Sequence, residues 1–148
     1  MPNAARRPVT VVALGVLGAA VAAVYLVAGV YLVGLGGLTL VGHVDGTTAD
    51  KLFVLALALL GAAVFLPLGL LAGWGVRQIW AGHGFAGLHS ASMILAGLSG
   101  FVLLGAGAAS FDRDKPPLIV VVAAAILFGL GFSAYRLART ATVRSWCR

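Results

Sequence analysis

The sequence predicts an all-α membrane protein, a four-transmembrane-helix bundle with both termini in the cytoplasm (N-in/C-in). Hydrophobic residues make up 61% of the 148 residues and charged residues only 9%, whereas soluble domains are about 45–50% apolar and about 25% charged. Four apolar runs are each near the roughly 20 residues that a helix needs to cross the hydrocarbon. Arginines gather on one side of these runs and aspartates on the other. The class excludes soluble enzymes, disordered chains and secreted disulfide scaffolds, and we expect one integral membrane domain over residues 1–148.

The first span is expected over about residues 9–33, directly after two arginines and Pro8. The apolar run itself continues to Val41, but three glycines within residues 34–37 weaken the helix there. The small residues at 20–22 also fit the cleavage site of a secretory signal. Because the apolar run continues well past that point, we interpret it as an uncleaved span.

The second span is expected over about residues 52–76. Thr47, Thr48 and Asp50 precede it and can accept hydrogen bonds from the unpaired N–H groups of its first turn. Pro67 lies inside the span, has no N–H to donate and clashes with the carbonyl four residues earlier. We therefore expect a helix kink at Pro67. A simple bend is favoured over a cavity lined by the freed carbonyl.

The third span is expected over about residues 88–109 and the fourth over about residues 117–135. Pro117 suits the first turn of the fourth helix, where a missing N–H would be unpaired in any case. No lysine, arginine, aspartate or glutamate interrupts the body of any span. The chain therefore lacks the intramembrane acid that ion-coupled transporters generally use.

Orientation follows from the charges between the spans. With four spans, one side of the membrane holds seven arginines and no acid: Arg6, Arg7, Arg77, Arg136, Arg139, Arg144 and Arg148. The other side holds Lys51, Arg113 and Lys115 against Asp45, Asp50, Asp112 and Asp114. Cytoplasmic loops are enriched in lysine and arginine, so we expect a multi-pass protein of the cell (plasma) membrane with both termini cytoplasmic. The net charge of +6 then reflects topology and anionic phospholipids of the bilayer rather than nucleic acid.

Glycine is abundant, with 21 residues mostly inside the spans. Helices associate in lipid through close packing, and small residues four apart let backbones approach. The candidate packing pairs are Gly15/Ala19, Gly69/Gly73, Ala96/Gly100 and Gly129/Ser133. The alternative is that glycine and alanine are simply common in this chain.

Three arginines form a candidate site for an anionic phospholipid. Arg77 ends the second span, and Arg136 and Arg139 end the fourth. If those ends are neighbours, the three cations can hold a lipid phosphate by charge-assisted hydrogen bonds. The alternative is that they only set the topology.

Few residues suggest chemistry. Residues 82–87 match the G-x-G-x-x-G pattern, but the dinucleotide motif requires a strand before it and a helix after it, so we expect a plain loop between two helices. His83 and His89, with Met93 one turn further, are metal or haem ligand candidates by residue type alone. We expect polar loop histidines and no metal, cofactor or catalytic residue. Cys147 is the single cysteine and cannot form an intramolecular disulfide.

The segment Gly73–Ala81 reads GWGVRQIWA, and the tail Val143–Trp146 reads VRSW. In these two segments and in its layout the chain resembles small, largely uncharacterised four-span bacterial integral membrane proteins. The resemblance implies an architecture and no activity. The chain lacks the intramembrane glutamate of small multidrug exporters and the paired cysteines of quinone-linked oxidoreductases.

Taken together, these features favour a non-enzymatic accessory or assembly subunit of a membrane complex, which packs glycine-rich faces against a second copy or a larger membrane-protein partner. The alternative is a homo-oligomeric small transporter, channel or lipid-handling protein, suggested by the proline and the arginines. A redox protein that uses His83 and His89 is the third class considered.

Overall fold

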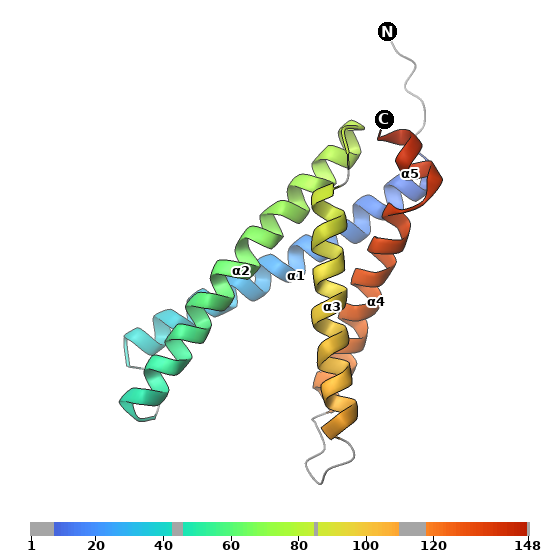
Figure 1. The fold of residues 1–148 in the computed structure, drawn as a ribbon. Coiled ribbons are helices and arrows are strands. Elements are labelled where there is room, and N and C mark those ends of the chain that lie inside the picture. The colour runs from blue at the N-terminus through green and yellow to red at the C-terminus, as the bar shows by residue number, and fades with distance from the viewer. Residues whose placement is uncertain (1–7, 43–45, 85, 110–117, 148) are drawn as a thin grey trace.

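The computed structural model describes residues 8–42, 46–84, 86–109 and 118–147, and within these ranges the regular elements are all α-helices. They are α1 (Val9–Leu40), α2 (Thr48–Ala81), α3 (Ala86–Ala109), α4 (Leu118–Ala138) and the short α5 (Ala141–Trp146) (Figure 1). The first four are long and apolar enough to cross a membrane. The predicted all-α class and the four apolar helices of membrane-spanning length are therefore confirmed.

The first two helices are longer than the predicted spans. α1 has 32 residues and continues through the glycines at 34–37 to Leu40. α2 has 34 residues and starts after a capping box, in which Thr47 and Asp50 hydrogen-bond each other's backbone N–H, as expected. It ends at Gly82, whose positive φ of 75° suits a residue without a side chain. At 1.5 Å per residue these helices measure about 50 Å, against about 30 Å of hydrocarbon, so they must tilt or project beyond it.

The helices form two antiparallel hairpins that diverge. α1 packs along α2, and α3 packs along α4. The hairpins meet at the end that holds the starts of α1 and α3 and the ends of α2 and α4, and they separate toward the opposite end (Figure 1). We call the first end the closed end. α1 packs against all the other helices, whereas the backbones of the described parts of α2 and α4 do not approach each other closely.

Leucines that lie on glycines hold the first hairpin together. The pairs are Leu26 on Gly69, Leu66 on Gly29 and Leu32 on Gly61. A methyl group built on any of these glycines would come within 2.6–2.8 Å of the leucine. The missing side chains therefore set how closely α1 and α2 approach, as expected for helices that associate in lipid.

The buried core lies at the closed end, where residues from all five helices meet. Its members include Val11, Leu14, Tyr25, Ile79, Leu88, Ala134 and Val143. Two long-range hydrogen bonds cross it. The Tyr25 hydroxyl of α1 donates to the Ala91 carbonyl of α3 over 2.9 Å, and Trp146 Nε1 of α5 donates to the Ile79 carbonyl of α2 over 2.9 Å.

Candidate functional site

The members of the predicted packing pairs have different surroundings. Gly69 packs on Leu26 between α1 and α2. Ala96 faces Gly131 of α4, and a methyl group built on Gly100 would lie 3.3 Å from the Phe128 ring. Gly73 and Gly129 have no atoms within 4 Å of such a methyl group, and Ser133 is exposed. Gly15 lies under the Trp80 indole, whereas Ala19 is exposed.

Several close approaches were not among the predicted pairs. Gly75 of α2 lies against the backbone of Leu88, and Gly131 of α4 lies against the backbone of Ser92 and Ala96. Pro67 lies inside α2, which continues through it, and its ring is exposed. The proline thus faces the outside of the hairpin.

Glycines with open space beside them occur on all four long helices. A methyl group would meet no atom within 4 Å at Gly34, Gly37, Gly73, Gly97, Gly105 and Gly129. Glycines inside the first hairpin are covered by leucines of the neighbouring helix, whereas these six glycines have open space beside them. These six residues are called the open glycines below.

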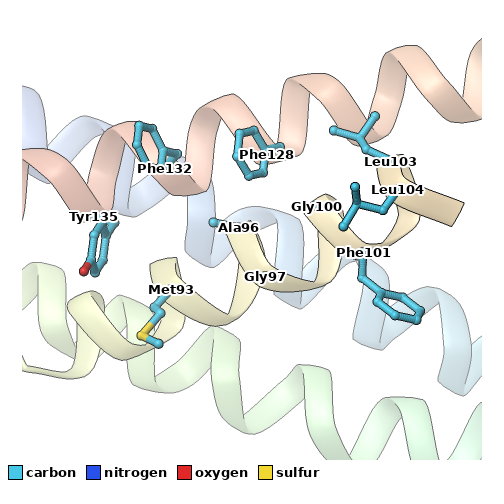
Figure 2. A pocket seen from close by; sticks show the side chains of 10 residues that line it. All are labelled: Met93, Ala96, Gly97, Gly100, Phe101, Leu103, Leu104, Phe128, Phe132 and Tyr135. Carbon is cyan, nitrogen blue, oxygen red and sulfur yellow. The ribbon is translucent and has the colours of Figure 1, made fainter. Parts of the chain in front are cut away.

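An apolar groove of about 750 Å³ runs between α3 and α4. Figure 2 shows small residues on α3 and aromatic rings on α4 facing this space. The lining includes Gly97, Gly100 and Phe101 from α3 and Phe128, Phe132 and Tyr135 from α4. The Tyr135 hydroxyl is the polar group that Figure 2 places at one end of the groove.

Two of the three predicted arginines lie at that end of the groove. Arg139 Nη1 donates a hydrogen bond of 2.8 Å to the Tyr135 hydroxyl, and its guanidinium carbon lies 5.5 Å from the ring centroid. The Arg136 guanidinium carbon lies 5.9 Å from the Phe132 ring centroid. Both arginines also line a smaller hollow of about 380 Å³. Arg77 is exposed on α2 and is not among the residues that line this hollow, so it is not part of this pair.

The two histidines occupy different settings. His83 is exposed in the turn after α2, as expected for a loop residue. His89 lies instead inside α3, where its ring stacks on Tyr135 at a centroid distance of 4.8 Å. Within residues 8–42, 46–84, 86–109 and 118–147, no three His, Cys, Asp or Glu side chains gather to hold a metal ion.

The tail after α4 packs onto the closed end. Val143 of α5 is fully buried, and the Trp146 indole bonds to the last turn of α2. Cys147 is half-buried beside them, and burial raises the pKa of its thiol, partly offset by a backbone hydrogen bond from Gly84. This packing was not predicted from the sequence, because only Val143 and Trp146 mark an apolar side in the six residues of α5.

The candidate site is therefore a surface rather than a set of reacting groups. Its parts are an apolar groove, two arginines at the end of that groove and the open glycines. Such a surface suits the binding of apolar chains, anions and other helices. A scan against models of protein families, a search of curated proteins and a search of solved structures each find no match.

Proposed function

We propose that this protein is a non-enzymatic accessory or assembly subunit of a membrane complex in the plasma membrane. The open glycines on α1, α2, α3 and α4 carry this proposal. Lipid tails are as apolar as leucine, so a bare apolar face does not by itself attract a partner, but a glycine lets another backbone approach closely. Inside the first hairpin, Gly29, Gly61 and Gly69 allow α1 and α2 to approach closely. A partner helix can approach the open glycines in the same way.

The proposed orientation places the closed end in the cytoplasm. Arg77, Arg136, Arg139 and Arg144 all belong to that end, and no acidic residue occurs in the segments around them. The positive-inside rule supports this placement. Cys147 is the single cysteine and offers a native probe. A membrane-impermeant maleimide should label it in inverted vesicles and not in intact cells, and labelling of intact cells would overturn the orientation.

Native mass spectrometry after gentle extraction from the native membrane tests the assembly role. We expect a defined complex with a second protein, and Gly73→Leu and Gly129→Leu should each release that partner. Ala63→Leu and Ala123→Leu add a leucine at exposed positions on other faces of the same helices and should leave the complex intact.

A homo-oligomer that survives in all four variants would instead support the small transporter, channel or lipid-handling protein. Retention of the heteromer in both glycine variants would contradict the role given to the open glycines. Either result can be read only if the variants are folded, so circular dichroism and gel filtration accompany each spectrum.

A further inference from the structure

The groove between α3 and α4 continues into the pair of arginines. Phe128, Phe132, Tyr135 and Arg139 follow one another at spacings of four, three and four residues, which places them on one face of α4. Arg136 is four residues after Phe132, and its guanidinium lies against that ring. Each arginine is thus in contact with a ring that lines the groove. The two arginines therefore adjoin the aromatic wall of the groove, and the groove and these arginines together are called the groove surface below.

The length of the groove surface matches one leaflet of a bilayer. The rise from Phe128 to Arg139 is about 16 Å at 1.5 Å per residue. Half of a hydrocarbon core of about 30 Å is about 15 Å. Arg139 is exposed at the end of α4, near where the polar headgroups begin, and Phe128 lies about one leaflet deeper.

The sequence places no acidic residue near Arg136 and Arg139. All four aspartates belong to the segment between α1 and α2, the first turn of α2, or the segment between α3 and α4, and the chain has no glutamate. The ends of α4 and α5 therefore have no acidic side chain nearby in sequence. Both arginines line a hollow of about 380 Å³ together with Leu137 and Thr140.

We propose that the groove surface binds an anionic phospholipid, with one acyl chain in the α3–α4 groove and the phosphate on Arg136 and Arg139. Guanidinium groups form charge-assisted hydrogen bonds with phosphate oxygens. The aromatic rings and the glycines of the groove provide an apolar wall along the chain. Binding does not depend on the assembly role, and the orientation proposed above only decides which leaflet supplies the lipid.

The test uses the purified full-length protein in mild detergent, titrated with phosphatidylglycerol or phosphatidylcholine of identical acyl chains and followed by native mass spectrometry. Two arginines near a headgroup favour the anionic lipid by about 30-fold. Arg136→Gln and Arg139→Gln should each lower that preference about 5-fold. Arg77→Gln removes the same charge from α2 and should leave the preference unchanged.

A second pair of variants tests the groove itself. Gly97→Phe places a ring in the groove from a position where an added methyl group would meet no atom within 4 Å. We expect this variant to lose the preference for phosphatidylglycerol. Gly73→Phe adds the same ring to open space on the other hairpin and should bind the lipid normally.

Three results would overturn the proposal. The first is equal binding of the two lipids by the unmodified protein, which would indicate ordinary annular lipid. The second is an equal loss in Arg77→Gln and Arg139→Gln, which would indicate an effect of net charge. The third is unchanged lipid binding in Gly97→Phe, which would show that the groove does not hold an acyl chain of the bound lipid.

Discussion

The approach of α4 to α3 at Gly131 predicts a sharp difference between two neighbouring glycines. A methyl group on Gly131 would lie 2.8 Å from the backbone nitrogen of Ala96 and 3.0 Å from the carbonyl oxygen of Ser92. Ordinary contacts begin at about 3.4 Å, so the helices must separate by several tenths of an ångström. Because the obstructing atoms are backbone, no side chain can rotate away. Gly129, two residues earlier in the same helix, has nothing within 4 Å.

The expected magnitude is a balance of two terms. Both Gly131→Ala and Gly129→Ala gain about 1 kcal/mol of helix propensity. Overpacking costs about 1–3 kcal/mol, and it applies only to Gly131→Ala. We therefore expect Gly129→Ala to be as stable as the parent or more so, and Gly131→Ala to have a free energy of unfolding about 1–3 kcal/mol below that of Gly129→Ala.

Reversible unfolding in mixed micelles of mild detergent and dodecyl sulfate, followed by circular dichroism, measures this difference. Both variants gain the same helix propensity on replacing glycine by alanine. The size of that gain in a micelle therefore cancels when their free energies of unfolding are compared. Equal free energies of unfolding for Gly129→Ala and Gly131→Ala would refute the argument that backbone contact at Gly131 fixes the distance between α3 and α4.

Other contacts lead to smaller, local effects. Tyr25→Phe removes the buried hydrogen bond from α1 to α3 and should lower the free energy of unfolding by about 0.6 kcal/mol, measured in the same micelles. Thr47→Ala removes the capping box of α2, so the amides of its first turn should exchange faster with solvent by mass spectrometry, with little change in the core. Because burial raises the pKa of Cys147, its alkylation rate should rise with pH at a higher midpoint than that of a short cysteine peptide. In Trp146→Phe, which loosens α5, that midpoint should move back toward the ordinary value.

The sequence was sufficient to predict four apolar helices, because the bilayer sets their minimum length and hydropathy. It also predicted a cap from Thr47, Thr48 and Asp50, of which Thr47 and Asp50, three residues apart, form the capping box. It did not predict where α1 and α2 end. The apolar run of the second span weakens at Arg77, but the helix continues to Ala81, since a helix can extend into the headgroups with its polar side chains exposed. Hydropathy reports where the hydrocarbon ends, whereas capping and turn residues decide where the helix ends.

The candidate site was predicted only in part, because packing depends on pairs of residues far apart in the chain. The search for small residues at a spacing of four selected Gly69 with Gly73, yet the first faces α1 and the second has open space. Gly131 approaches the backbone of α3 just as closely, but the residues four before and four after it are Leu127 and Tyr135. When a leucine or the backbone of another helix packs on a glycine, the residues next to that glycine in the sequence do not show it. Arg136 and Arg139 could be selected from charge alone, but the groove beside them required the partner helix.

The divergence of the two hairpins has a physical basis in the solvent that surrounds them. In water, exposed leucines and phenylalanines such as Leu60 and Phe101 would favour collapse of the open end. In lipid that driving force is absent, and only close packing and hydrogen bonds hold helices together. Those contacts are concentrated at the closed end, in the bonds of Tyr25 and Trp146 and in the approach of Gly75 to Leu88. Apolar exposure therefore says little about partners in this protein, and the informative features are the open glycines and the arginines beside the groove.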